Sequence, residues 1–103
     1  MRDDLIMRGT TPVNIFETDI DLTGAEVIYI TYKQGRCIVL EKSLPDIDVY
    51  SDRLEVSLSQ EDTLLFGDQD VTMQIRARFP GNPAVASDWM RAPVGAILKD
   101  GVI

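Results

Sequence analysis

Three pairs of aspartates are the residues of this chain whose type and spacing come closest to a chemical site. In an extended chain, residues i and i+2 lie on the same face, so each pair can offer two carboxylates to one calcium ion. The alternative is that the pairs are solvated aspartates in turns and at strand ends. None of them is accompanied by the glycine and distal glutamate of a complete calcium-binding loop. The pairs are Asp19 and Asp21, Asp46 and Asp48, and Asp68 and Asp70.

Catalytic side chains are scarce in the sequence. Its 103 residues include no histidine and a single cysteine, which excludes serine or cysteine nucleophiles that depend on histidine and zinc sites with histidine ligands. Cys37 lies beside Ile38 and Val39 and is predicted to be a small buried residue rather than a reactive thiol. A sandwich of this length leaves little room for a glycosidase cleft, and the dispersed glycines form no phosphate loop. We therefore expect a non-catalytic protein without a cofactor.

Four aromatic residues could form a surface for a carbohydrate or a protein partner: Tyr29, Tyr32, Tyr50 and Trp89. Most of them are expected in the core or in cross-strand pairs. Trp89 is the exception, because the residues around it are polar, and an exposed tryptophan is a typical interface anchor. Trp89 and the nearby Arg91 are therefore candidate interface residues.

The charge of the chain limits its partners. Its formal net charge is -7, from 17 acidic and 10 basic residues, and the basic residues do not cluster in the sequence. Nucleic acid and anionic membrane surfaces are therefore disfavoured as partners. No apolar run approaches the roughly 20 residues that span a bilayer, and the apolar stretch at residues 5–7 is too short for a signal peptide. One cysteine cannot form an intramolecular disulfide, which suits a reducing cytoplasm or a particle assembled there.

The elements that must position these residues are predicted mainly from period-2 alternation. In residues 71–79, Val71, Met73, Ile75, Ala77 and Phe79 share one face, the residues between them are mostly polar, and a Pro-Gly turn follows. Gly35 suits a hairpin turn at residues 33–36. Strands are expected at residues 13–18, 25–32, 37–41, 47–50, 53–58, 71–79 and 84–92. About seven strands at this spacing predict an all-β, immunoglobulin-like antiparallel sandwich.

One segment breaks the alternation. Ser59 and Asp62 have the spacing of a capping box, and apolar residues follow them, so a short helix is expected near residues 60–66. Gly67 is predicted to stop this helix. We interpret it as a crossover between two sheets. Residues 1–103 are expected to form one domain, with flexibility in residues 1–8.

Three segments of the chain resemble a known group of proteins. They are Arg8-Gly9-Thr10-Thr11-Pro12 near the start, Gln60-Glu61-Asp62-Thr63-Leu64 in the middle and the closing run Ile97-Leu98-Lys99-Asp100-Gly101-Val102-Ile103. The chain resembles small structural proteins encoded near the tail and baseplate genes of phages and prophages of Gram-positive bacteria. Asp21-Leu22-Thr23-Gly24-Ala25-Glu26-Val27 is similar to the start of the N-terminal immunoglobulin-like domains of phage baseplate and tail-fibre proteins.

The resemblance implies a structural role without specifying any chemistry. It implies a component of a phage tail or baseplate that assembles in the bacterial cytoplasm, forms homo-oligomers and contacts other phage structural proteins. The alternative hypothesis is a host-surface module that binds carbohydrate, or binds through calcium. It is motivated by the aromatic residues and the aspartate pairs.

The apolar end of the chain adds further candidate interface residues: Ile97, Leu98, Val102 and Ile103. One hypothesis is that this tail forms a last internal strand and covers the core. The other, slightly favoured because Gly101 interrupts a long strand, is that the tail pairs with a neighbouring subunit.

Overall fold

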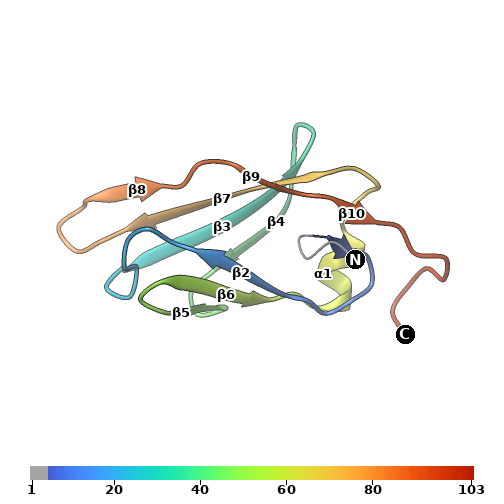
Figure 1. The fold of residues 1–103 in the computed structure, drawn as a ribbon, viewed down its shortest axis with the longest axis horizontal. Helices are drawn as coiled ribbons and strands as arrows, with labels where there is room; N and C mark the ends of the chain where they lie inside the picture. Colours follow the sequence, from blue (N-terminus) through green and yellow to red (C-terminus); the bar gives the residue numbers. More distant parts are fainter. Residues whose placement is uncertain (1–4) are drawn as a thin grey trace.

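The computed structural model of the protein describes residues 5–103, and its main feature is a sandwich of two antiparallel sheets (Figure 1). The smaller sheet has the order β2 (Val13–Glu17), β6 (Arg53–Ser57), β5 (Ile47–Val49). The larger sheet has the order β4 (Cys37–Ser43), β3 (Val27–Gln34), β7 (Val71–Arg78), and both β8 (Ala84–Ala86) and β9 (Met90–Ala92) pair with the far side of β7. Separately, β1 (Ile6–Met7) pairs in parallel with β10 (Val94–Gly95).

The connectivity is that of an immunoglobulin-type sandwich. In that fold, strands B, E and D share one sheet, and strands G, F, C and C′ share the other. Here β2, β6 and β5 occupy the first three places, and the β8–β9 edge, β7, β3 and β4 occupy the other four. The predicted all-β class is confirmed. The structure adds the short strands β1 and β10 and divides the expected strand at residues 84–92 into β8 and β9.

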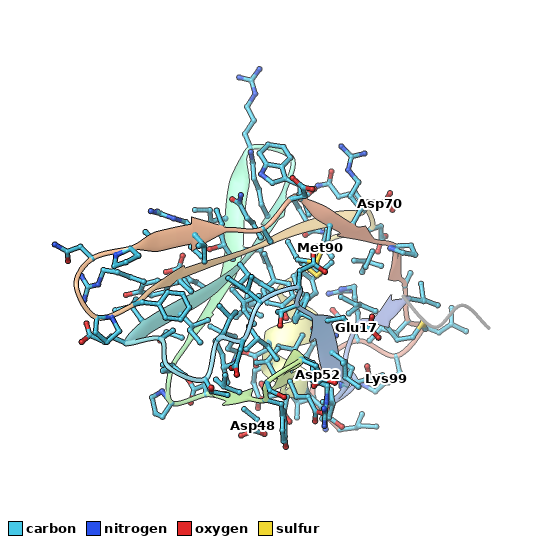
Figure 2. All side chains as sticks on the ribbon, turned by 60° about the vertical axis from the view of Figure 1, so that its left-hand side comes forward. Glu17, Asp48, Asp52, Asp70, Met90 and Lys99 are labelled. Carbon is cyan, nitrogen blue, oxygen red and sulfur yellow. The ribbon has the colours of Figure 1, made fainter. Side chains whose placement is uncertain are left out.

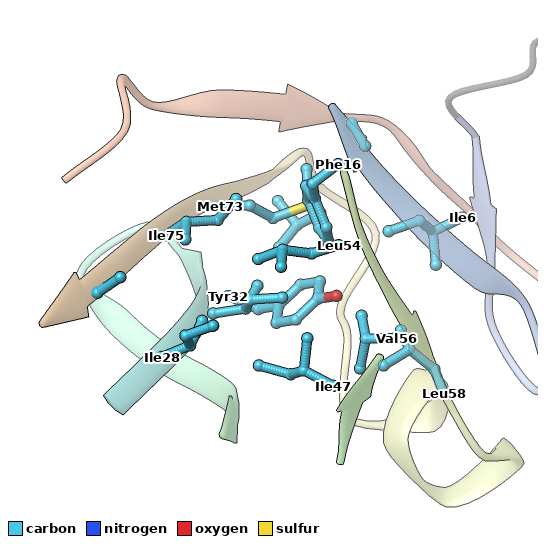
Figure 3. Packing of buried hydrophobic residues seen from close by; sticks show 14 of the residues in the cluster. Ile6, Phe16, Ile28, Tyr32, Ile47, Leu54, Val56, Leu58, Met73 and Ile75 are labelled. Atoms are coloured by element: carbon cyan, nitrogen blue, oxygen red, sulfur yellow. The ribbon is translucent and has the colours of Figure 1, made fainter. Parts of the chain in front are cut away.

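Tyr32 on β3 lies at the centre of the core. Its ring is fully buried and contacts Phe16 from the facing sheet edge-on, with 6.5 Å between ring centroids, and Phe66 at 5.8 Å. Figure 3 shows Tyr32 between the two layers, with its hydroxyl pointing toward the smaller sheet. That hydroxyl donates a hydrogen bond of 2.7 Å to Asn14 Oδ1 on β2. Burial, and secondarily the charge of Asp62, raise the pKa of Tyr32, so the hydroxyl remains a donor.

The strand faces follow the predicted alternation most closely in β7. Val71, Met73, Ile75 and Ala77 are buried, whereas Arg76 and Arg78 are exposed. β3 behaves in the same way, with every second residue from Ile28 to Gln34 buried. These two strands are direct neighbours, and together they form most of the larger sheet's inner face.

The helical crossover is confirmed, but its predicted stop is wrong. Helix α1 (Gln60–Leu64) carries the chain from β6 in the smaller sheet to β7 in the larger one. Ser59 Oγ accepts from the Asp62 amide, and Asp62 Oδ2 accepts from the Ser59 amide, which completes the capping box. The helix ends on Leu65 with ordinary right-handed backbone angles. Gly67 does not cap it but exchanges hydrogen bonds with the side chain of Gln34.

Cys37 is exposed, so the prediction of a buried residue is wrong. It pairs with Gln34 beside the β3–β4 turn, at the end of the hairpin that projects at the top of Figure 1. The apolar neighbours Ile38 and Val39 suggested burial, but this end of β4 extends past the facing sheet. Residues 1–4 of the segment expected to be flexible lie outside the described residues. In its remaining part, Ile6 and Met7 form β1.

Candidate binding surfaces

The three aspartate pairs do not converge on a common site. Asp48 lies on β5, and Asp70 lies in the loop before β7, so the two appear on opposite sides of the molecule in Figure 2. Asp21 Oδ1 accepts hydrogen bonds from the hydroxyl and the amide of Thr23, and these bonds lower the pKa of Asp21 in an exposed turn. Among residues 5–103, no group of three or more acidic or cysteine side chains is placed to hold a metal ion.

A hollow beside Trp89, which we call the Trp89 hollow, brings together two sets of residues predicted from the sequence. They are the interface candidates Trp89 and Arg91, and Asp70 of the aspartate pairs. Trp89 is 63% exposed, and Lys33 Nζ lies 5.3 Å from the centroid of its ring. The hollow beside it has a volume of about 350 Å³. It brings an aromatic ring, two cations, a carboxylate, an amide and a hydroxyl together at one end of the larger sheet. Its lining residues are Lys33, Gly35, Gln69, Asp70, Thr72, Trp89 and Arg91.

Gln34 holds one wall of this hollow in place. Its side chain is buried, donates to the carbonyl oxygens of Gly67 and Gln69 at 3.0 and 2.8 Å, and accepts from the Gly67 amide at 2.8 Å. The three bonds fix the loop that carries Asp70 against the end of β3. Sequence reasoning missed this residue, although its inward position in the alternation of β3 would have identified a buried polar side chain.

The other aromatic residues divide between the core and the surface. Of Tyr29, Tyr32 and Tyr50, only Tyr32 belongs to the core, whereas Tyr29 is 44% and Tyr50 is 41% exposed. Tyr29 lies on the outer face of the larger sheet, and Tyr50 stacks against the Arg53 guanidinium at 4.1 Å. Tyr32 therefore has the expected core position, and Tyr29 lies opposite Ser43 and Arg76 of the two neighbouring strands.

Residues 8–12, 60–64 and 97–103 meet at one end of the molecule, which we call the α1 end. Arg8 donates to the Leu64 carbonyl at 3.2 Å and lies 3.7 Å from the Asp100 carboxylate. Thr63 donates to the Thr10 carbonyl at 2.9 Å. The side-chain amide of Gln60 accepts from the backbone N–H of Ile103 at 2.9 Å and donates to its carbonyl oxygen at 3.2 Å. Residues far apart in the sequence thus form one polar network around α1. Figure 1 shows α1 and the C-terminus at this same end of the molecule.

The glycine of the first segment is required at this end. Gly9 has a φ of +73°, which side chains other than glycine rarely adopt, and a Cβ there would meet Ile97 Cδ1 at 3.0 Å. Ile97 is half-buried in this contact. The other three candidate tail residues, Leu98, Val102 and Ile103, are 107%, 56% and 89% exposed and form no strand. The hypothesis of an internal last strand that covers the core is therefore wrong.

The free edge of β2 is a third surface, which sequence reasoning did not single out. Leu58 donates to the Pro12 carbonyl and Thr18 to the Asp52 carbonyl, both at 2.9 Å, so even-numbered residues of this segment exchange backbone hydrogen bonds with β6. In an antiparallel ladder the alternate residues point their N–H and C=O groups the other way. Those of Val13, Ile15 and Glu17 therefore point away from the sheet. Within the described part of the chain, no strand pairs with this edge.

The side chains of β2 also reverse the usual pattern. Asn14 and Phe16 point into the sandwich, where Asn14 bonds to Tyr32 and Phe16 packs on its ring. Val13 and Ile15 point outward and are 53% and 59% exposed. The strand thus places a polar residue inside and two branched apolar residues outside. Isolated exposed apolar residues need no explanation, but two adjoining ones beside free backbone groups are typical of an interface.

A groove runs along the side of the sandwich beside this edge. It consists of two hollows of about 340 and 510 Å³, which lie between the β2 side and the β8–β9 side and share Met90. Figure 2 shows Met90 and Glu17 on this same side of the molecule. Apolar residues, including Ile6, Phe16 and Val85, line much of the groove. Glu17, Asp19 and Asp88 make the larger hollow acidic.

No helix among the described residues has the length and apolar character needed to cross a bilayer. No protein-family model, curated protein or solved structure matches the chain.

Proposed function

We propose that the protein is a non-catalytic component of a phage or prophage tail or baseplate that acts by assembling with other protein chains. The free edge of β2 is the observation that carries the assembly part of this proposal. It offers unpaired backbone groups and two outward apolar side chains, the combination through which sheets most readily join other chains. The phage part is supported by the resemblance of residues 8–12, 60–64 and 97–103.

The α1 end adds support of a different kind. The three resembling segments interlock through Arg8, Gln60 and Thr63, so the likeness concerns one connected structure and not three unrelated short matches. Such a network positions the exposed Leu98, Val102 and Ile103 at the surface of the domain, where another structural protein can reach them.

The experiment is to purify the particles that are produced by the strain encoding the gene. After a density gradient, the protein should co-sediment with intact particles in a fixed ratio to the tail proteins. Antibody labelling in electron microscopy should then place it on the tail or the baseplate. Recovery in the free lysate alone, with none on particles, would contradict the proposal.

A glycan-binding role is the second candidate, and the Trp89 hollow favours it. A sugar can stack its apolar face on an exposed aromatic ring while its hydroxyl groups bond to nearby polar side chains. Trp89 supplies the ring, and Asp70, Gln69 and Arg91 supply the polar groups around the same hollow. A host-surface module of this kind would bind the bacterial cell wall.

A glycan array, screened with and without Ca²⁺, tests the second candidate. Binding that is lost in Trp89→Ala and retained in Tyr29→Ala would support it, because Tyr29 is exposed on the same sheet but does not line the hollow. Dependence on Ca²⁺ would involve the aspartate pairs. No binding under either condition would eliminate this role.

A further inference from the structure

We propose that β2 is a homotypic interface, in which β2 of one copy pairs antiparallel with β2 of a second copy about a two-fold axis at Ile15. The result is a continuous sheet in the order β5–β6–β2–β2–β6–β5. This inference rests on the proposed function, because it names a second copy of the chain as one of the partners in assembly.

The backbone of β2 has the geometry that this pairing requires. The outward N–H and C=O groups belong to Val13, Ile15 and Glu17, which are alternate residues. With Ile15 opposite Ile15 of the second copy, Val13 lies opposite Glu17 and Glu17 opposite Val13. Each is a hydrogen-bonded pair of an antiparallel ladder, giving about six backbone hydrogen bonds. The whole length of the strand is then used.

The side chains select the same register. The exposed Ile15 side chains of the two copies meet on the outer face, and each Val13 packs against the stem of a Glu17. No like charges are directly opposite. A shifted register that pairs Glu17 with Glu17 would place two carboxylates face to face, which is unfavourable. The two-fold register therefore combines apolar burial with the absence of charge repulsion.

The acidic charge of the chain does not oppose this arrangement strongly. The nearest carboxylate to Ile15 along the sheet is that of Glu55 on β6. Between the two Glu55 residues lie both β2 strands, and three strand spacings amount to about 14 Å. Exposed charges separated by more than about 8 Å are largely screened at physiological salt.

The remaining edges lack this combination, which is why the proposal concerns β2. β5 and β8 are only three residues long. β4 is longer, but its pairing is interrupted by a register shift, and Glu41 and Lys42 lie within it. Short length, charge and irregularity are the features that protect edges from association. β2 contains no proline, lysine or bulge, and its single charged residue, Glu17, lies at its end.

Sedimentation equilibrium of the full chain and its variants tests the interface. The wild type should dimerise, and Ile15→Lys and Ile15→Glu should each raise the dissociation constant at least about tenfold, because each places like charges on the axis. A mixture of the two variants should regain dimers, since lysine then faces glutamate. Ile38→Lys is the matched control: Ile38 is 65% exposed on β4, and its replacement should leave dimerisation unchanged.

Val13 tests the register. Val13→Lys should preserve or strengthen the dimer, because it faces Glu17 of the second copy, whereas Val13→Glu should weaken it. If an unspecific apolar patch held the two copies together, both substitutions would weaken the dimer. Circular dichroism and melting curves establish that each variant is folded.

The inference would be overturned by a wild type that stays monomeric up to millimolar concentration, or by an Ile15→Lys variant that dimerises like the wild type. It would also be overturned if Val13→Lys weakened the dimer and Val13→Glu preserved it. A monomeric wild type that is still found on particles would refute the interface and leave the proposed function standing. A protein that dimerises with the expected variant behaviour but never joins particles would support the interface and refute the proposed function.

Discussion

β7 and β2 are both strands with alternating inward and outward residues, yet they distribute apolar character in opposite ways. In β7 the inward residues are Val71, Met73, Ile75 and Ala77, and polar residues alternate with them on the outer face. In β2 the inward Asn14 is polar, and the outward Val13 and Ile15 are apolar. β7 also has pairing partners on both sides, whereas β2 has one neighbour among residues 5–103.

The difference separates residues that stabilise the fold from residues available for binding. All four inward residues of β7 belong to the hydrophobic core. Asn14 points inward from β2 because the buried Tyr32 hydroxyl needs a hydrogen-bond acceptor between the two sheets. Val13 and Ile15 of the same strand lie on the surface, where a further chain can cover them.

The largest expected effect is a contrast between these two strands. Met73→Asp or Ile75→Asp buries an unpaired charge and should destabilise the domain by about 4 kcal/mol or more, enough to unfold most of it. Val13→Asp, the matched change on the outer face of β2, should alter the free energy of unfolding by about 0.5 kcal/mol or less in dilute solution. Urea titrations followed by circular dichroism measure both. Cooperative melting of soluble Met73→Asp near the wild-type temperature would show that the assigned faces are inverted.

The polar position inside β2 should have an intermediate effect. Asn14→Ala leaves the buried hydroxyl of Tyr32 without its acceptor and should cost about 2 kcal/mol. The control is the double variant Asn14→Leu with Tyr32→Phe, which removes both partners and should recover much of the loss. If the single variant melts like the wild type, the hydrogen bond between the strands does not explain why Asn14 points inward.

The same contrast shows how far the sequence predicts the fold. In β7, period-2 alternation assigns every face correctly, because apolar residues fall on the inward side only. In β3 the alternation is less clear, because Val27 and Tyr29 point outward and Gln34 points inward. The alternation of β2 is misleading, since Val13 and Ile15 would be assigned to the core from their type. Only the position of Tyr32 across the sandwich explains Asn14, and a contact between residues so far apart in the sequence cannot be read from local spacing.

The candidate surfaces were less predictable than the fold, for a similar reason. The polar surroundings of Trp89 single out this residue and the nearby Arg91, but Gln69 and Asp70 join them because Gln34 anchors their loop. The sequence neighbours of Cys37 predict a core position, although Cys37 is exposed at the end of the projecting β3–β4 hairpin (Figure 1). The free edge of β2 depends on strand order, which local spacing does not contain.

The crossover that joins the two sheets offers a pH-dependent test. Burial raises the pKa of Asp62, but its bonds from the Ser59 amide and from Lys42 Nζ, at 2.9 Å each, outweigh burial and lower that pKa below the ordinary value of 3.8. A lowered folded-state pKa stabilises the fold above pH 4, and this contribution disappears as the carboxylate is protonated in more acidic solution. Asp62→Asn should therefore cost about 1 kcal/mol at pH 7 and progressively less below pH 4. A pH-independent difference between the two proteins would contradict this assignment.

A loss of similar size is expected from the other half of the capping box. Ser59→Ala removes the hydroxyl that accepts from the Asp62 amide at 3.1 Å and should cost about 1 kcal/mol. Ser59→Asp keeps an acceptor at the cap and is the control. An unchanged denaturation midpoint for Ser59→Ala would mean that the cap contributes nothing to the crossover between β6 and β7.

A similarly small effect on stability is expected at the α1 end, from deletion of residues 97–103. The deletion removes the half-buried Ile97, the ion pair of Arg8 with Asp100, and the two bonds between Gln60 and Ile103, most of which are exposed to solvent. Such contacts contribute about 1 kcal/mol in total, so the melting temperature should fall by only a few degrees.

Like Val13 and Ile15 on β2, the apolar residues Leu98, Val102 and Ile103 lie outside the core, so their removal should impair assembly more than folding. Particle incorporation is therefore measured together with melting. Ile97→Ala is the control variant, because it removes the one half-buried apolar contact and keeps the exposed residues in place. If the truncated chain stays folded but no longer enters particles, whereas Ile97→Ala does, the exposed tail is an assembly element like the β2 edge. If the melting temperature of the truncated chain collapses while the intact chain is a monomer, the tail belongs to the fold, and the comparison with β2 fails at this end of the molecule.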